Sequence, residues 1–437
     1  MKNIYQLGAV ALISATLSLA TWEVSSTEAQ LGNVNLFNKD DQQESITKQP
    51  INQLISQPSV DINAVVRGNN AFALDLYKQL RHQEGNFVFS PYSISVGLAM
   101  TYAGAEGQTA TEISQVLRFP QQPESLHSAL ATLSAELNTS EEQGFQLMMA
   151  NRLWGQKGFS FLNTFREITQ NYYGAELEEL DFVKYAPQAR QTINQWVEQQ
   201  TQNKVRNLIA ANNLDSLTRL VLTNAIYFKG TWVNKFQVDQ TEENRFSVTP
   251  DVQVDVPMMY QLNDRWELRS LELDNLQGLE LPYVGNKIAM VILLPKQVDG
   301  LAAIEQQLTT DNLQNWLGSL SKGEGNLEIW LPKFKCDSKF DFEQVFSEMG
   351  MASAFDQASA NFSGLNGKKD LFLENVIHKT VVEVDEFGSE VAAATAIPGG
   401  TRGRTTTFRA DHPFIFMILD KNSGSILFLG RVVNPLS

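Results

Sequence analysis

Apolar residues recur at helical spacing in the first part of the chain. Phe72, Leu76 and Leu80 stand four residues apart behind the polar start at Asp61, and this spacing predicts an amphipathic helix. A second, mostly apolar helix is expected over residues 96–103. Over the whole chain, 43% of the residues are hydrophobic, which suffices for one large core or two ordinary domains.

Three further helices follow from local patterns. Two are indicated by apolar stripes, which consist of Leu126, Leu130, Leu133 and Leu137 and of Ala189, Ile193, Trp196 and Val197. Pro187 stands where the second stripe begins, and proline is favoured in the first turn of a helix. Thr109 and Glu112 have the spacing of a capping box, which predicts a helix that begins at Thr109 and buries Ile113.

Continuous apolar runs predict β-strands later in the chain. The runs cover residues 220–228, 287–294, 327–331 and 381–384. Helices and strands do not alternate regularly, which favours an α+β fold over a doubly wound parallel sheet.

The composition changes abruptly after Gly388. The run SEVAAATA at residues 389–396 has side chains too small to fill a core, yet its alternation is compatible with a strand. Pro398 and the two glycines after it interrupt regular structure, and the tip beyond them carries Arg402 and Arg404. Taken alone, such a run is typical of a solvated surface loop that a protease reaches easily.

The N-terminus has the pattern of an export signal. Lys2 precedes an apolar run at residues 7–20, which is short for a membrane span and ends in small residues. Residues 1–20 are therefore expected to be a signal peptide, with secretion to the extracellular space or periplasm; an uncleaved membrane anchor is the alternative. Residues 21–60 are polar and low in apolar content, which predicts a disordered linker.

Charge and cysteine content narrow the classes of partner. The 437 residues carry a formal charge of −15 and no basic stripe, which argues against nucleic acid and against a heparin-like polyanion. A cationic partner is favoured at long range. Cys336 is the only cysteine, so the chain has no internal disulfide.

Little in the sequence supports catalysis. The chain has four histidines, and it lacks the zinc-hydrolase, dithiol and α/β-hydrolase motifs. Asn224 and His378 stand inside apolar strand runs, so each needs a hydrogen-bond partner if it is buried. On residue type alone, His378 is a core histidine with its hydrogen bonds satisfied.

Several stretches resemble the serpins, the serine protease inhibitor family. The matching segments are SPYSI (90–94), NAIYFKGTW (224–232), EVDEFGSEVAA (383–393), FRADHPFIF (408–416) and LFLGRVVNP (427–435). The resemblance extends from about residue 61 to the end and implies one domain over 61–437. The implied fold has three β-sheets, eight or nine helices and an exposed reactive loop at about 386–408.

The resemblance also implies a function and its residues. Counting along the loop at the family's spacing from either side reaches Arg402 as the residue before the attacked bond, with Gly403 after it. A serine protease of trypsin-like specificity would attack this bond, and the loop would then insert into the main sheet and trap the acyl-enzyme. The implied hinge residues are Glu386, Gly388, Ser389, Glu390, Val391, Ala392, Ala393 and Ala394. The implied sheet-opening cluster is Ser90, Ser93, Asn224 and His378, with Trp232 near the point where the loop enters the sheet.

Two departures from the family pattern qualify this reading. Pro398 cannot donate to a β-ladder, and Val391 replaces a smaller residue. We expect a monomer that is not an enzyme, needs no cofactor or metal, and is not membrane-bound after signal cleavage. The alternative is a non-inhibitory serpin that acts as a carrier, chaperone or protease-sensitive binding protein.

Overall fold

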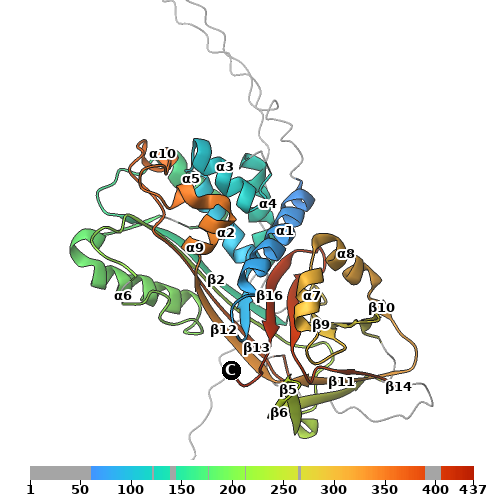
Figure 1. The fold of residues 1–437 in the computed structure, drawn as a ribbon. Coiled ribbons are helices and arrows are strands. Elements are labelled where there is room, and N and C mark those ends of the chain that lie inside the picture. The colour runs from blue at the N-terminus through green and yellow to red at the C-terminus, as the bar shows by residue number, and fades with distance from the viewer. Residues whose placement is uncertain are drawn as a thin grey trace, which may run out of the picture. The chain divides into compact units, whose positions relative to one another are not determined.

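The computed structural model describes residues 61–120, 123–137, 144–175, 177–211, 213–263, 267–388 and 405–437 (Figure 1). Within them lie ten α-helices, two of only four residues, against the eight or nine expected. They are α1 (Ile62–Leu80), α2 (Pro91–Tyr102), α3 (Gly107–Val116), α4 (Pro123–Leu137), α5 (Asn163–Tyr173), α6 (Phe182–Gln200), α7 (Leu301–Gln307), α8 (Thr310–Ser319), α9 (Glu343–Phe346) and α10 (Ser363–Asn366).

The described strands form three sheets, which confirms the expected α+β architecture. A seven-stranded sheet has the order β1 (Phe87–Phe89), β16 (Ile426–Val432), β15 (Phe414–Asp420), β9 (Ile288–Pro295), β8 (Leu276–Pro282), β7 (Arg269–Glu272) and β10 (Ser321–Lys322). A four-stranded sheet has the order β14 (Thr405–Arg409), β11 (Asn326–Pro332), β6 (Val252–Asn263) and β5 (Glu242–Thr249). A five-stranded sheet has the order β12 (Phe334–Asp341), β13 (Asn375–Val384), β4 (Leu220–Gly230), β2 (Phe145–Gln156) and β3 (Glu178–Leu180).

The centre of the five-stranded sheet is a parallel pair, β4 and β13. Their register sets Asn224 opposite His378, and each strand pairs antiparallel with its outer neighbour, β2 or β12. Because β4 and β13 are parallel, both end at the same edge of the sheet, and Gly388 follows β13 at that edge. The expected loop therefore leaves the sheet beside the end of β4.

Helices cover both faces of this sheet (Figure 1). On one face, α6 buries Ile193 and Val197 against Tyr227 and Val381 of the central strands. On the other face, α2 contacts β4, β2 and β16. Side chains at both faces of β4 are thus buried, which explains why that strand reads as a continuous apolar run.

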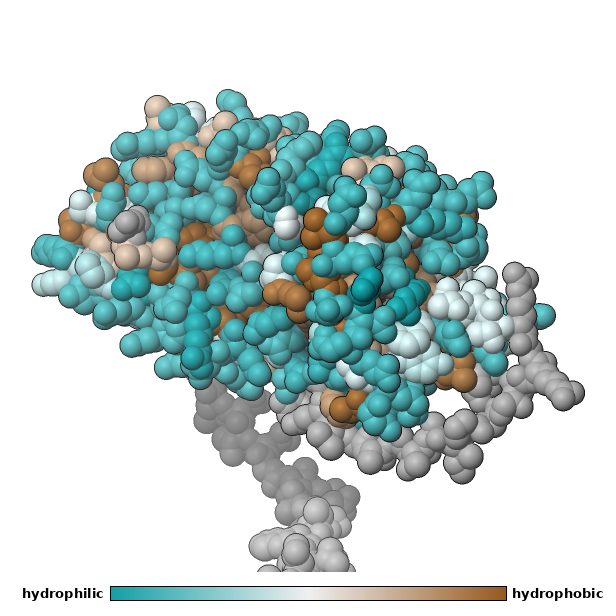
Figure 2. All heavy atoms as spheres, turned by 60° about the horizontal axis from the view of Figure 1, so that its bottom comes forward, coloured by the Kyte–Doolittle hydropathy of each residue, from teal (hydrophilic) through white to brown (hydrophobic). Residues whose placement is uncertain are grey.

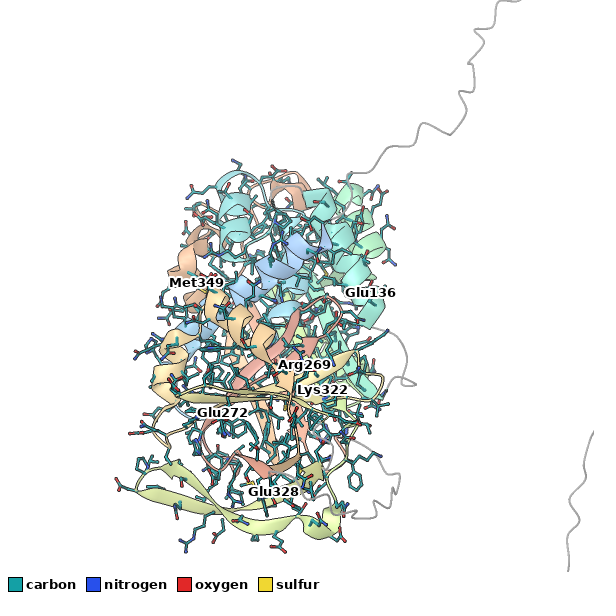
Figure 3. The ribbon with its side chains drawn as sticks, turned by 90° about the vertical axis from the view of Figure 1, so that its right-hand side faces the viewer. Glu136, Arg269, Glu272, Lys322, Glu328 and Met349 are labelled. Carbon is teal, nitrogen blue, oxygen red and sulfur yellow. The ribbon has the colours of Figure 1, made fainter. Side chains whose placement is uncertain are left out.

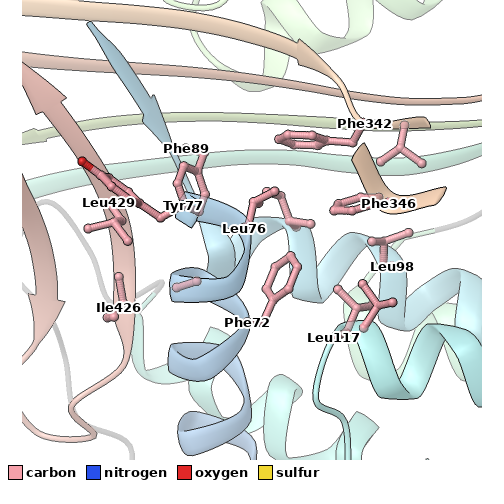
Figure 4. Packing of buried hydrophobic residues seen from close by; sticks show 14 of the residues in the cluster. Phe72, Leu76, Tyr77, Phe89, Leu98, Leu117, Phe342, Phe346, Ile426 and Leu429 are labelled. Carbon is pink, nitrogen blue, oxygen red and sulfur yellow. The ribbon is translucent and has the colours of Figure 1, made fainter. Parts of the chain in front are cut away.

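The first expected helix is confirmed as α1. The Asp61 carboxylate accepts a hydrogen bond from the Ala64 amide at 3.0 Å and caps the helix. Phe72, Leu76 and Leu80 are fully buried in a core shared with α2, α9 and β16, and Figure 4 shows Phe72 and Leu76 beside Phe346 and other members of this core.

Two predicted helix starts are wrong. The second helix begins at Pro91, capped by Ser90, and not near residue 96. Thr109 lies inside α3, which begins at Gly107, so the capping box does not form. The Thr109 hydroxyl instead accepts a hydrogen bond from the Asn361 amide, and Glu112 accepts one from Ser353. Both side chains that the local pattern assigned to a capping box therefore form hydrogen bonds with residues far away in the sequence.

The remaining expected elements are present with small shifts. The stripe of four leucines is buried in α4. In α6, Tyr185 interrupts the helical conformation, so that Pro187 lies in the first turn of the longer part. The strands expected at 220–228, 287–294 and 327–331 correspond to β4, β9 and β11.

The view of the four-stranded sheet shows a mostly hydrophilic face with hydrophobic side chains in small groups (Figure 2). In Figure 3, Glu328 of β11 lies with this sheet, whereas Met349 lies close to the helices near α9. We call the part of the expected reactive loop between Gly388 and Thr405 the reactive segment. It connects two different sheets, because β13 of the five-stranded sheet precedes it and β14 of the four-stranded sheet follows it.

Candidate functional site

The hinge begins where β13 ends, and its backbone is held by the segment after β4. The Trp232 indole donates to the Asp385 carbonyl at 2.9 Å, and the Trp232 amide donates to the Phe387 carbonyl at 3.1 Å. The Phe236 amide donates to the Glu386 carbonyl at 3.0 Å. Trp232 itself is 2% exposed and stacks on Tyr283 with ring centroids 4.3 Å apart. The backbone of the hinge is therefore hydrogen-bonded to a buried tryptophan that stacks on Tyr283.

Gly388 is the last described residue before the reactive segment. Its φ of +69° lies in the left-handed region, and a Cβ placed there would stand 2.2 Å from the Gly230 carbonyl oxygen and 2.6 Å from the Trp232 nitrogen. Both the backbone conformation and the close approach to the end of β4 require a glycine.

Glu386 secures the hinge with an ion pair. Its carboxylate lies 2.8 Å from Lys333 Nζ, which follows β11, and the carboxylate side chain is 5% exposed against 38% for the lysine. Burial raises the pKa of the Glu386 carboxyl, whereas the hydrogen bond from Lys333 and the positive charge of that lysine lower it. The lowering is the larger effect, so the pKa of Glu386 lies below its ordinary value. The carboxylate is thus charged, buried and paired at the point where the chain leaves the sheet.

His378 lies at the centre of a second, fully buried group. The Ser90 amide donates to His378 Nε2 at 3.1 Å, so this nitrogen must accept, and Nδ1 must carry the proton that it donates to Asn224 Oδ1. The Thr380 hydroxyl also contacts Nε2. Burial lowers the pKa of the His378 imidazole to about 3, so the ring is neutral.

Asn224 extends this group towards α2 and β2. Its amide donates to Ser93 Oγ at 2.9 Å and to Asn151 Oδ1 at 2.7 Å. Ser93 also donates its hydroxyl to Asn151 Oδ1 at 3.2 Å. We call Ser90, Ser93, Asn151, Asn224, His378 and Thr380 the central polar cluster; it connects β13, β4, β2 and the start of α2.

The serpin family model, whose description is serine protease inhibitor, matches residues 67–435 of the chain. The chain belongs to the serpin family. This serpin is 39% identical over 379 residues to serpin B6 of Macaca fascicularis, covering 86% of this chain and all of that protein. It is 41% identical over 375 residues to the leukocyte elastase inhibitor of Bos taurus, covering 84% and 98%.

Solved serpin structures agree with this assignment. The crystal structure of uncleaved ovalbumin matches with a TM-score of 0.78 and 31% identity, over 85% of this chain and all of that one. Serpin48 of the insect Tenebrio molitor, described as highly specific, matches with a TM-score of 0.75 and 35% identity, over 85% and 98%. The family is one of protease inhibitors, so this serpin is a protease inhibitor and not an enzyme.

The structure brings together some of the sequence-predicted site residues of this serpin. Ser90, Ser93, Asn224 and His378 share the hydrogen-bonded cluster, whereas Trp232 lies apart from it, at the hinge. The hinge residues from Ser389 to Ala394 and the bond between Arg402 and Gly403 lie outside the described residues, as do the expected signal peptide and linker.

Sequence reasoning missed three participants. Asn151 and Thr380 belong to the central polar cluster, and Lys333 pairs with the hinge. Asn224 was identified because it is a polar residue inside a strand-like apolar run. Thr380, two residues after His378, is also a polar residue inside such a run and could have been identified in the same way. No local signal marks Lys333, because its pairing depends on how two sheets meet.

Two features are absent from the described part of the chain. No helix there is long and apolar enough to cross a bilayer. The same residues contain no group of three side chains able to hold a metal ion.

Proposed function

We propose that this serpin inhibits a serine protease of trypsin-like specificity by the insertion of its reactive segment between β4 and β13. The observation that carries the proposal is the direct parallel pairing of these two strands, with the hinge held beside the end of β4. A strand that turns back at Gly388 would run antiparallel to both neighbours and could hydrogen-bond to each of them.

The energetics support such a step. In the uninserted sheet, β4 and β13 share one ladder of hydrogen bonds that pairs eight residues of each strand. Insertion replaces this ladder with two ladders, one on each side of the new strand, so the net gain is about one ladder. At roughly 0.5–1.5 kcal/mol per net hydrogen bond, about eight bonds contribute about 4–12 kcal/mol. That range is comparable with the total stability of a typical protease domain, about 5–15 kcal/mol, so insertion is able to distort an attached enzyme.

The choice of protease rests on Arg402. A trypsin-like primary pocket carries a carboxylate that requires a cationic partner, and the tip of the loop supplies two arginines, at 402 and 404. The relative named leukocyte elastase inhibitor favours a second candidate, a protease of the elastase type. The two candidates differ in the side chain that they accept before the cleaved bond.

The test is to mix the purified protein with trypsin and with leukocyte elastase. We expect a complex with trypsin that survives denaturation, and cleavage mapped between Arg402 and Gly403. Arg402→Ala should slow association with trypsin by more than about tenfold, because it leaves the pocket carboxylate unpaired. Arg404→Ala is the matched control and should change the rate little. A stable complex with elastase alone would transfer the assignment to that protease, and cleavage without any stable complex would favour the non-inhibitory alternative.

We further propose that the protein is exported, on the basis of the apolar run at residues 7–20. Expression of the full chain in a secreting host, followed by mass spectrometry of the mature N-terminus, tests this. Leu12→Arg should abolish export because it places a charge in the apolar run. Recovery of uncleaved protein in the membrane fraction would support the anchor alternative.

A further inference from the structure

The segment that joins β14 to β15 contains a histidine whose two ring nitrogens both face oxygen atoms. His412 is 7% exposed. Its Nε2 lies 2.6 Å from the carbonyl oxygen of Pro295, the last residue of β9, and its Nδ1 lies 2.9 Å from Asp411 Oδ1. A backbone carbonyl oxygen can only accept a hydrogen bond, so Nε2 carries a proton and donates it to Pro295.

Asp411 requires a second proton on the same ring. Burial raises the pKa of the Asp411 carboxyl, whereas the hydrogen bonds and positive charges of His412 and Arg409 lower it, and the pKa lies below its ordinary value. The carboxylate is therefore charged and can only accept, so Nδ1 also has to carry a proton. His412 makes both contacts only as an imidazolium. Histidine is the side chain that changes its charge between about pH 5 and pH 8, so the pair of contacts is sensitive to pH.

The same carboxylate secures the end of β14. Arg409, the last residue of β14, donates from Nε to Asp411 Oδ2 at 3.0 Å and from a terminal nitrogen to Asn244 Oδ1 of β5 at 2.8 Å. Its guanidinium carbon lies 4.7 Å from the centre of the Trp330 ring of β11. The Asp411 carbonyl accepts a hydrogen bond from the Ser247 amide of β5 at 2.8 Å. The position of Asp411 therefore determines how the end of β14 is attached to its own sheet.

Charged side chains on the neighbouring strands have partners of their own. Lys296 follows β9 directly, and its ammonium group lies 2.6 Å from the carboxylate of Glu272 on β7. On β11, Glu328 accepts a hydrogen bond from a threonine hydroxyl of β14 at 3.2 Å. The contacts from β5 come from an amide and a carboxamide, which do not titrate. The contact between His412 and Asp411 is thus the one that changes when the ring changes its charge.

Loss of one proton removes one of the two contacts of the ring. A neutral ring keeps its proton on Nδ1 or on Nε2, so the other nitrogen presents a lone pair to an oxygen atom that can only accept. Two acceptors in contact at a buried position are unfavourable, so the ring or the carboxylate has to move. Among the described strands, β14 is at the edge of its sheet and pairs with β11 alone, over five residue pairs. A strand that is held on one side is sensitive to the loss of an attachment at its end.

We propose that His412 is a pH-sensitive switch for the strand that follows the reactive segment. With both nitrogens protonated, the ring connects Asp411 to Pro295 and keeps the end of β14 close to β9. When the ring loses a proton, one connection is lost and β14 is held less tightly on β11. The proposal rests on the described contacts, and it depends neither on the target protease nor on insertion between β4 and β13.

The test measures amide hydrogen exchange in the full chain from about pH 5.5 to about pH 8, with each rate divided by the intrinsic rate of an unprotected amide at that pH. We expect the protection of residues 405–411 to fall by about three- to tenfold over this range, which is the effect of losing about one net hydrogen bond. His412→Gln does not titrate, so its protection should change by less than about twofold. His82→Gln, at an exposed histidine, is the matched control and should behave as the wild type does.

A second variant keeps the test informative if His412→Gln folds poorly. Asp411→Asn keeps the shape of the side chain, and its carboxamide can donate or accept, so a neutral ring no longer has to face an acceptor there. The pH dependence of protection should again disappear. A pH dependence that persists in both variants would overturn the proposal.

Nitrogen-15 NMR of the four histidine rings measures protonation directly. The signal of His412, identified by its absence from His412→Gln, should show a proton on both nitrogens at about pH 5.5 and the loss of one of them as the pH rises towards about 8. A ring with an unprotonated nitrogen at the acid end, or one that keeps both protons up to the alkaline end, would contradict the switch whatever the exchange rates are.

Discussion

The parallel strands β4 and β13 are held together by polar contacts at two places, the hinge and the central polar cluster, and the contacts differ between the two. At the hinge, the Trp232 indole and the Trp232 and Phe236 amides donate hydrogen bonds to backbone carbonyls, and Glu386 forms an ion pair with the partly exposed Lys333. At the central polar cluster, every hydrogen bond involves a side chain, and all members except Asn151 are at most 1% exposed. Water can therefore reach the Lys333 end of the ion pair at the hinge, whereas it does not reach His378 and Asn224 at the centre of the cluster.

This difference implies a division of roles. Loss of one cluster side chain leaves its partners buried and unpaired, which costs more than the lost bond itself. Loss of the ion pair at the hinge leaves Lys333, which water can reach. We therefore expect substitutions in the cluster to destabilise the whole uninserted sheet, and substitutions in the hinge to act more weakly and more locally.

The largest effect is expected for Asn224→Ala. It removes the acceptor of the His378 Nδ1 proton and the donor to Ser93 and Asn151, so several buried groups lose their partner. The free energy of unfolding should fall by about 3–5 kcal/mol, measured by urea denaturation. Asn422→Ala, at an exposed position, is the control and should stay within about 0.5 kcal/mol. A loss of less than about 1 kcal/mol in Asn224→Ala would show that the cluster does not hold the sheet.

Acid should weaken the same cluster. The pKa of His378 is about 3 in the folded protein and about 6.5 when unfolded, so between these values the unfolded state binds the extra proton and stability falls as pH falls. The slope from this residue approaches about 1.4 kcal/mol per pH unit below pH 6, and about 1.6 kcal/mol is lost between pH 6.5 and pH 5. Urea titrations at several pH values should give a shallower slope for His378→Gln. Equal slopes in the two proteins would contradict the buried neutral ring.

At the hinge, Gly388→Ala should act through a steric clash with Gly230 as well as through its backbone conformation. Gly85 provides a matched control, because its φ of +76° is similar but nothing lies within 4 Å of its added Cβ. We expect Gly388→Ala to lower the free energy of unfolding by about 1–2 kcal/mol more than Gly85→Ala. The same change should also raise the rate at which an added synthetic peptide with the sequence of residues 389–397 incorporates beside β13. Equal destabilisation by the two substitutions would mean that the hinge is not pressed against β4.

The smallest effect is expected for Glu386→Gln, which keeps the shape of the side chain and removes the ion pair with Lys333. Since the lysine is partly exposed, the loss should be about 1 kcal/mol at pH 7. It should shrink as pH falls below the ordinary glutamate range, because the native carboxylate then becomes protonated. Glu383→Gln breaks the more exposed pair with Lys335 and should cost less than about 0.5 kcal/mol. A larger effect at Glu383 would reverse our ranking of the two pairs.

The sequence predicted the elements whose burial is regular. Four-residue spacing identified α1 and α4, and unbroken apolar runs identified β4 and β9, because burial on one stripe or on both faces leaves a clear pattern. No pattern identified β2, whose sequence FQLMMANRLWGQ mixes apolar residues with Gln, Asn and Arg. Its Asn151 and Arg152 are accommodated by partners from α2 and β3, which local periodicity does not reveal.

The site divides in a similar way. The motifs that resemble serpins located Gly388, Asn224 and His378, and the small residues of 389–396 were recognised from composition. What the sequence did not provide was the geometry between them: Asn224 and His378 lie 154 positions apart and meet only because β4 and β13 are neighbours.

The sequence by itself determined the family, the α+β class and the small-residue segment with its two arginines, because these depend on residue identity along a continuous stretch. Tertiary structure alone decided that β4 and β13 lie directly side by side, that Glu386 pairs with Lys333, and that Asn151 joins the central polar cluster. Each of these contacts joins residues far apart in the chain. Their distances are set by how sheets and helices pack together, which no local pattern of hydrophobic and polar positions specifies.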